Sequence, residues 1–118
     1  MTVKVGIQLY SVRNAMAADP EGTLARLAEL GFTRVEGANH TADVDPGIGF
    51  GIAAERLAAA LRESGVSIVG SHINPLDVDR LGPTLDFHAA IGNPGIGCDI
   101  EFYPYGDVDY VKRRAAAF

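Results

Sequence analysis

The chain has 118 residues, with 10 Lys and Arg against 15 Asp and Glu, and 47% of its residues are hydrophobic. This length fits one domain with one core, and the apolar residues that recur from end to end exclude wholesale disorder. The formal net charge of -5 argues against a surface dedicated to nucleic acid. We therefore predict a single domain over residues 1–118 that has no nucleic-acid partner.

Cysteine content and hydropathy bear on the cellular setting. Cys98 is the only cysteine of the sequence, so no intrachain disulfide is possible and a reducing, cytoplasmic setting is expected. The N-terminal residues enter an alternating strand directly, and no apolar run reaches the roughly 18 residues that a membrane helix needs. The sequence predicts neither an export signal nor a membrane partner.

Strand and helix patterns alternate along the chain. Period-two apolar patterns predict strands over Val3–Tyr10, Thr33–Glu36, Val66–Ile73 and Cys98–Tyr103. Apolar residues at helical spacing predict helices over about Pro20–Leu30, Ala53–Leu61, from near Pro83 to Gly92, and over Asp107–Phe118. Asp19 and Asp107 are the expected N-caps, and Gly31, Gly65 and Gly92 the expected helix ends.

The spacing of the strands indicates the fold class. Strands begin about every 30 residues, which is the length of one strand-and-helix unit. Parallel strands joined by helices form a doubly wound open sheet or a (β/α)8 barrel, and the alternating pattern favours the barrel because central strands of an open sheet are continuously apolar. We predict an α/β fold, the (βα)4 half of a TIM (β/α)8 barrel. The segment Ala115–Phe118 still has a helical pattern, so we expect a chain cut from a longer repeat.

Hydrogen-bonding side chains stand near the C-terminal ends of all four predicted strands: Gln8, Glu36, His72 and Glu101. Active sites of barrels lie at that edge. His72 is the sharpest candidate, because a neutral imidazole can bind a metal or exchange a proton near neutral pH, and Tyr10 could stack on a substrate. Each residue also has a structural interpretation. Gln8 could be a hydrogen-bonded amide of the core, and Glu36 could form an ion pair at the end of its strand. His72 could be a buried core histidine, Glu101 a surface or ion-paired carboxylate, and Tyr10 a side chain that packs over the core.

Other chemistry-bearing residues give weaker signals. We expect His88 to be structural, and His40, in the loop after the second strand, has no sequence neighbour at metal-ligand spacing. The glycines of residues 47–51 lack the pattern of a phosphate-binding loop, so a lid or a connector is expected there. No Ser-His-Asp order, nucleophile elbow or Cys-His pair can be assembled, and nucleophilic hydrolysis is not supported.

Three blocks, Val5–Arg13, Leu27–Gly37 and Val69–Ile73, resemble the opening of sugar phosphate isomerase/epimerases of the xylose-isomerase-like barrel superfamily. The resemblance implies a (β/α)8 barrel that binds a divalent metal (Mn, Mg, Co or Zn) and moves hydrogen between neighbouring carbons of a sugar or polyol. It implies roles at the C-terminal edge for Gln8, Glu36 and His72, with His72 nearest to substrate or metal. The main metal ligands of the family come from later strands. We therefore expect the isolated chain to be catalytically incomplete, and binding of no metal is one of the possibilities for it.

The leading hypothesis is part of a metal-assisted isomerase or epimerase that acts on a sugar, sugar phosphate or inositol-type polyol. Two alternatives remain: a non-catalytic half-barrel module or truncated product, and an apurinic-endonuclease-like metal hydrolase of the same superfamily, which the acidic charge disfavours. The first and fourth predicted strands would form unpaired edges. We therefore expect a homodimer or higher oligomer that closes an eight-strand ring and buries the barrel positions Val35 and Ile68.

Overall fold

The computed structural model describes residues 3–98 and 106–117. Strands and helices alternate along these residues, broadly as predicted. The elements are β1 (Gly6–Gln8), η1 (Leu9–Val12), α1 (Arg13–Ala18), α2 (Pro20–Glu29), β2 (Arg34–Asn39), α3 (Ala54–Ser64), β3 (Ser67–Ile73), η2 (Val78–Arg80), α4 (Leu81–Ala90), β4 (Ile96–Gly97) and α5 (Val108–Ala117).

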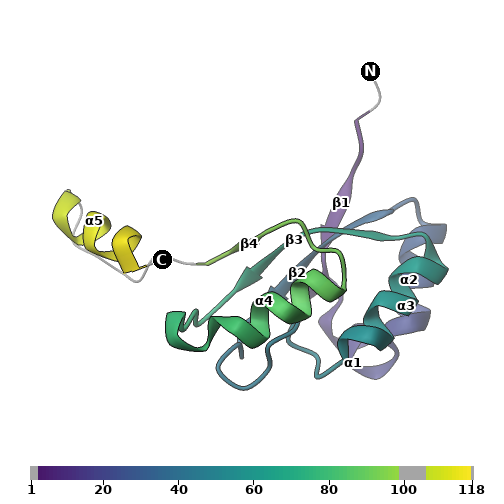
Figure 1. Cartoon of the computed structure of the whole chain (residues 1–118). Coiled ribbons are helices and arrows are strands. Elements are labelled where there is room, and N and C mark those ends of the chain that lie inside the picture. The colour runs from purple at the N-terminus through teal and green to yellow at the C-terminus, as the bar shows by residue number, and fades with distance from the viewer. Residues whose placement is uncertain (1–2, 99–105, 118) are drawn as a thin grey trace.

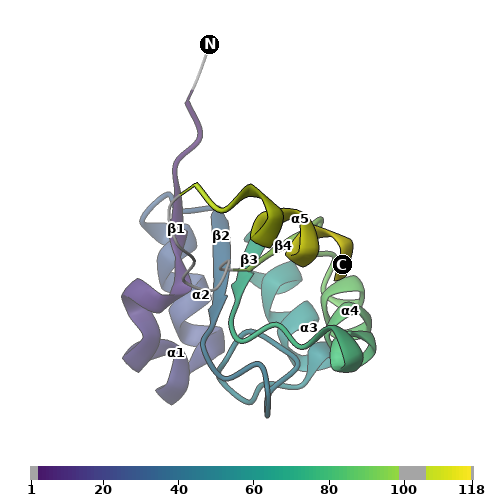
Figure 2. The same ribbon diagram turned by 90° about the vertical axis from the view of Figure 1, so that its left-hand side faces the viewer.

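The strands form one parallel sheet in the order β1-β2-β3-β4. Helices α1 to α4 lie along one face of this sheet, as the two views show (Figures 1 and 2). A doubly wound open sheet would carry helices on both faces, whereas a barrel carries all its helices outside. The one-sided arrangement is therefore that of a barrel segment.

Local capping explains where the helices begin and end. The side chain of Asp19 accepts a hydrogen bond from the Gly22 N–H at 3.0 Å, and Pro20 occupies the first turn, where a missing N–H costs nothing. Gly31 follows α2 with a φ of 90°, and Gly65 ends α3 with a φ of 71°. Both glycines take the left-handed conformation that residues with a Cβ avoid, so the predicted cap and helix ends are confirmed.

The first and fourth strands differ from the prediction. Only Gly6–Gln8 of the expected strand Val3–Tyr10 pairs in the sheet, because the chain turns into η1 and the short helix α1, which the sequence did not predict. The fourth strand begins earlier than expected, at Ile96, and most of the predicted strand Cys98–Tyr103 lies outside the described residues. The predicted cap of the last helix is confirmed, since Asp107 accepts a hydrogen bond from the Tyr110 N–H at 2.8 Å.

The hydrophobic core lies between the sheet and its covering helices. Val35 of β2 and Ile68 of β3 are buried there together with Leu24 and Leu27 of α2 and Leu57 of α3. The expectation that Val35 and Ile68 point into the barrel interior is therefore wrong. In a barrel the apolar stripes of the helices bury the outward side chains of the strands, and these two positions supply that layer.

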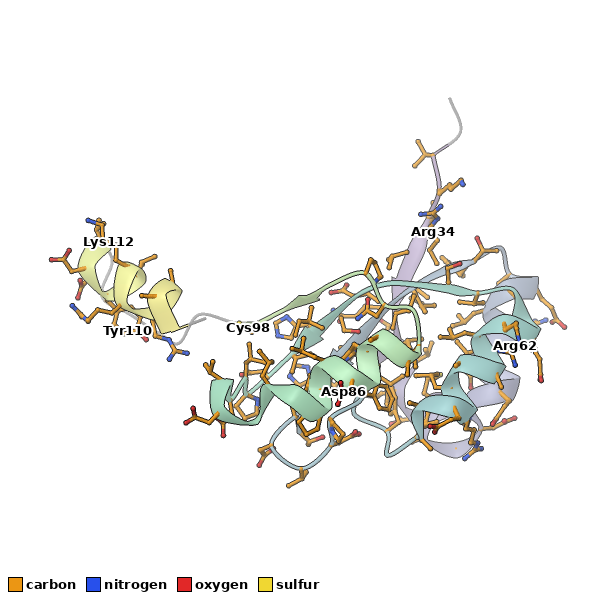
Figure 3. The ribbon with its side chains drawn as sticks, viewed as in Figure 1. Arg34, Arg62, Asp86, Cys98, Tyr110 and Lys112 are labelled. Carbon is orange, nitrogen blue, oxygen red and sulfur yellow. The ribbon has the colours of Figure 1, made fainter. Side chains whose placement is uncertain are left out.

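Helices α1 to α4 leave the other face of the described sheet uncovered (Figures 1 and 2), and its outermost strands are β1 and β4. Arg34, at the start of β2, and Cys98, just after β4, lie near opposite ends of the sheet (Figure 3). Helix α5, which carries Tyr110 and Lys112, lies away from the layer of α1 to α4 (Figures 1 and 3). None of the helices in the described part of the chain is long and apolar enough to cross a bilayer.

Candidate site at the C-terminal edge of the sheet

Three of the predicted site residues lie on the sheet face that the helices leave uncovered. Alternate residues of a strand point to opposite faces. Val35 and Ile73 are fully buried on the helix side, so their neighbours Glu36 and His72 are directed to the open side, where both are half-buried. Gln8 pairs in register with Glu36 across β1 and β2, which brings an amide and a carboxylate side by side.

A bulge in β3 determines the direction of His72. Val35 is opposite Ile68 in the sheet, but the next residue of β2, Glu36, is opposite Gly70, so Val69 is an extra residue. The extra residue reverses the alternation. Ile68 is buried on the helix side, and His72 nevertheless lies on the open side. Strict alternation along the predicted strand Val66–Ile73 places Ile68 and His72 on one face, and this expectation is wrong because of the bulge. His72 lies at the C-terminal edge, as predicted.

Tyr10 and His72 meet at this edge through a third ring, that of His40. The ring centroids of Tyr10 and His40 are 4.9 Å apart at an interplanar angle of 72°, and those of His40 and His72 are 5.8 Å apart at 42°. Spacing along the sequence gave His40 no partner, but the ends of β1, β2 and β3 meet at one edge and place it between the other two. The guanidinium carbon of Arg13 lies 4.6 Å from the centroid of the Tyr10 ring.

The loop that follows His40 is fixed by two side chains. Asn39 is fully buried; its Nδ2 donates to the carbonyl oxygens of Asp45 and Gly47, and its Oδ1 accepts from the Thr41 N–H. The carboxylate of Asp45 accepts hydrogen bonds from the Gly47 and Gly51 N–H groups at 2.7 and 3.0 Å. These bonds hold residues 39–51 in a defined shape, which favours the connector interpretation of the glycines over a mobile lid.

Comparison with known proteins gives this arrangement a context. No family model matches the chain, and no curated protein matches it. Two crystal structures of sugar phosphate isomerase/epimerases from Parabacteroides distasonis resemble it closely in shape. One is 23% identical with a TM-score of 0.76 over 99% of this chain and 46% of its own, and the other is 20% identical with a TM-score of 0.72 over 97% and 47%.

The chain has the fold of half of a (β/α)8 barrel. It spans about half the length of the two isomerase/epimerase structures. The predicted α/β half-barrel is thus confirmed, and so is the resemblance in fold. In this half-barrel the open face of the sheet corresponds to the interior of the complete barrel, and its C-terminal edge to the active-site end of such enzymes.

The half-barrel offers two neighbouring imidazoles to a metal, those of His40 and His72. Catalytic metal sites usually need at least three protein ligands. Within residues 3–98 and 106–117, no three side chains of His, Cys, Asp or Glu come together as such a site. The described residues therefore do not form a complete metal site. The predicted site residue Glu101 lies outside the described residues.

His88 lies in the core of the half-barrel, as expected for a structural histidine. It is 3% exposed, and its Nδ1 lies 2.9 Å from the side-chain nitrogen of Asn93, which in turn contacts the Ser71 hydroxyl at 3.1 Å. Burial lowers the pKa of His88, and the Gly47 backbone and the Asp45 charge only partly oppose this shift. This histidine is kept neutral and links α4 to β3.

A hollow at the other end of the sheet is a competing location. A cavity of about 480 Å³ at the N-terminal edge is lined by residues that include Lys4, Arg34 and Ser67. Helices α2 and α3 end beside it at Gly31 and Gly65, and in a (β/α)8 barrel this end of the strands serves stability, whereas active sites lie at the other end. The hydrogen-bonding and aromatic side chains of Gln8, Glu36, Tyr10 and His72 lie at the opposite edge, and we place the candidate site there.

Proposed function

We propose that the open face of this half-barrel binds a sugar, a sugar phosphate or an inositol-type polyol, as part of an isomerase or epimerase that moves hydrogen between adjacent carbons. The observation that supports the proposal most strongly is the meeting of Gln8, Glu36 and His72 with Tyr10 and His40 at one edge of the sheet. A barrel segment with a purely structural role would carry Val, Ile or Leu at these inward positions. The fold shared with sugar phosphate isomerase/epimerases supports the same assignment.

The side chains have complementary hydrogen-bonding roles. The Gln8 amide donates and accepts, and the Glu36 carboxylate accepts, so the pair can hold neighbouring hydroxyl groups of a polyol. His72 pairs with Ala38 in register, two residues further toward the edge than Glu36, and can bind the next oxygen along the substrate. The ring of Tyr10 can pack against the C–H face of a sugar.

These roles are to bind and orient substrate. A metal-assisted version of the reaction, which the resemblance implies, needs ligands from outside the described residues in addition to His40 and His72. Correct orientation of the reacting carbons is itself a large factor in rate, because a misplacement of about 1 Å can reduce the rate about 100-fold.

The test is exchange of solvent deuterium into a substrate. The native polypeptide that contains residues 1–118 is loaded with manganese or cobalt and incubated in D2O with a panel of ketoses and inosose-like ketones, and exchange is followed by proton NMR. We expect exchange next to the carbonyl of at least one compound, and a decrease of about tenfold or more in Glu36→Gln and His72→Gln. Glu63→Gln, an exposed position on α3, is the matched control. Absence of both exchange and conversion to an isomeric product with every compound would overturn the proposal, because a direct hydride shift converts the substrate without exchange.

The second candidate is a non-catalytic half-barrel module that associates with another copy or another barrel segment. The uncovered sheet face and the exposed valines of the N-terminal arm favour it, since Val3 and Val5 are 77% and 60% exposed. Calorimetric titration with manganese, cobalt or zinc separates the two candidates. Sub-micromolar binding that His72→Ala abolishes would contradict an inert module, and absence of binding would support one.

Association of the half-barrel is a separate proposal. Strands β1 and β4 are the outermost strands of the described sheet. Outermost strands with unpaired backbone groups and exposed valines nearby promote pairing with another chain. We propose that residues 1–118 form a homodimer or higher oligomer through these two strands. Sedimentation equilibrium at micromolar concentration should give at least twice the chain mass, with a decrease in Val5→Asp. A monomer with dispersed amide resonances would contradict this.

A further inference from the structure

An apolar groove of about 420 Å³ runs along one side of α2. Its lining includes Val12 of η1, Ala15 and Ala18 of α1, and Leu27 and Leu30 at the end of α2. Leu30 is 58% exposed. A leucine that is more than half uncovered beside other apolar side chains marks a surface that a further element can cover.

The groove lies on the side of α2 that faces away from α3. On the α3 side of this helix, Glu21 pairs with Arg56 of α3 at 2.6 Å. Successive residues of a helix are rotated by about 100°, so Leu30, nine positions after Glu21, lies half a turn away from it. Helix α2 is the first helix after β1, an outermost strand of the described sheet. The groove is therefore at the β1 end of the helix layer, where the described half-barrel has no further helix of that layer.

Helix α5 has an apolar stripe and stands clear of the helix layer (Figure 1). Val108, Val111 and Ala115 recur at spacings of three and four residues, which places them on one face of the helix. Val108 is 59% exposed, and none of the three belongs to the buried core of the described residues. The stripe is thus a second apolar surface, and it lies on the element that follows β4, the other outermost strand.

The order of the strands determines where α5 would lie in a closed ring. Parallel connections are right-handed, so the helix after each strand packs across that strand and the next one in the sheet. When β4 of one copy pairs with β1 of its partner, the next strand after β4 is the partner's β1. Helix α5 then lies beside the partner's α2, on the side that carries the groove.

The charges of the two helices favour the same contact. Helix α5 has one acidic residue, Asp109, and three basic ones, whereas α2 with its N-cap has one basic residue, Arg26, and three acidic ones. Opposite net charges favour contact between α5 and α2. Like charges oppose contact between the α2 helices of two copies, which disfavours a dimer that joins groove to groove.

We propose that the stripe of Val108, Val111 and Ala115 in α5 packs into the groove of a second copy of this chain, and that the second copy does the same in return. The inference rests on the association proposed above and specifies the surface that each copy covers. Because every helix of a barrel runs antiparallel to the strands, α5 and the partner's α2 would run in the same direction.

The experiment compares the association of two complementary variants of residues 1–118 by sedimentation equilibrium. Leu30→Asp places a carboxylate in the groove, and Val111→Lys places an ammonium group in the stripe. A twofold dimer contains two contacts between stripe and groove, and each variant alone alters both. We therefore expect the Kd of dimerisation to rise about tenfold or more in each variant. In an equal mixture, the heterodimer keeps one unaltered contact, and we expect tighter association than in either variant alone.

The matched controls introduce the same charges outside the two surfaces. Ala25→Asp, at an exposed position of α2, and Ala116→Lys, at an exposed position of α5, should associate like the parent chain, and circular dichroism shows that all four variants fold. A dimer that persists unchanged in either Leu30→Asp or Val111→Lys, equal weakening in the controls, or no recovery on mixing would overturn this inference alone. A monomeric parent chain would overturn the association proposal together with it. The exchange test of the isomerase proposal is independent of these outcomes.

Discussion

The two faces of the sheet are made by the same strands and yet have different compositions. On the helix side, Val35 and Ile68 are buried in the apolar core, and Ile73 is also fully buried. On the open side, the neighbouring positions in the same strands are Glu36, Gly70 and His72. Because buried apolar and half-buried polar side chains alternate along the strands, a substitution on the helix side should alter folding, whereas under the proposed function one on the open side should alter binding.

The sharpest comparison uses two adjacent residues of β3. Ile73→Ala removes a fully buried side chain, so we expect the free energy of unfolding to fall by about 2–5 kcal/mol. His72→Ala, on the open face, should lower it by less than about 1 kcal/mol. Urea denaturation followed by circular dichroism measures both, and equal losses from the two variants would mean that the faces are not separated as described.

Asn39 tests whether the edge loop depends on a buried side chain. Asn39→Ala leaves the carbonyl oxygens of Asp45 and Gly47 and the N–H of Thr41 without their partner, and we expect a loss of about 2–4 kcal/mol in the free energy of unfolding. Hydrogen exchange at Thr41 should accelerate in the same variant. Asn14→Ala, at an exposed position on α1, is the control and should change neither quantity.

His88 makes the core sensitive to pH. Burial lowers its pKa in the folded state, so the unfolded chain takes up a proton first as the pH falls through the ordinary value of 6.5. The stability from the neutral imidazole is complete above that value and is lost below it, with a slope of at most about 1.4 kcal/mol per pH unit.

The corresponding measurement is urea denaturation between pH 7.5 and pH 5, in the parent chain, His88→Gln and the exposed-site control His40→Gln. The control should keep the slope of the parent and His88→Gln should lose most of it. A slope that disappears in His40→Gln and persists in His88→Gln would refute the assignment.

The smallest expected effect is at the cap of α2. Asp19→Ala removes the acceptor of the Gly22 N–H, and we expect a loss of about 1 kcal/mol in the free energy of unfolding. Asp43→Ala, in an exposed part of the loop after β2, serves as control by thermal denaturation. A loss in the control as large as in Asp19→Ala would show that the cap contributes nothing specific.

Much of the fold was accessible from the sequence because its signals are local. The cap at Asp19 and the left-handed glycines Gly31 and Gly65 act within one turn of a helix, and the structure confirms all three. The bulge at Val69 was not accessible, because it depends on how β3 pairs with β2. The short helix α1 was also missed, since the alternation of Val3 to Leu9 extends across residues that do not all pair.

The candidate site was predicted in part. Gln8, Glu36 and His72 could be assigned to one edge because parallel strands share a direction, and they lie there. The contacts of His40 with Tyr10 and His72 join residues from three separate loops and strand ends, so spacing gave no signal for them. The role of Asn39 had only a weak signal in the sequence, namely the turn-forming residues 45–47. The Asn39 side chain donates hydrogen bonds to the carbonyl oxygens of Asp45 and Gly47 in this turn.

The central claim is that the open face at the C-terminal edge, and not the opposite edge, carries the chemistry. The most direct test compares solvent-deuterium exchange by the native polypeptide in variants of the two edges. We predict that Gln8→Ala, Glu36→Gln and His72→Gln lose exchange while remaining folded, and that Lys4→Gln, beside the cavity at the N-terminal edge, keeps it. Exchange that survives in all three open-face variants, or that is lost in Lys4→Gln, would contradict the account.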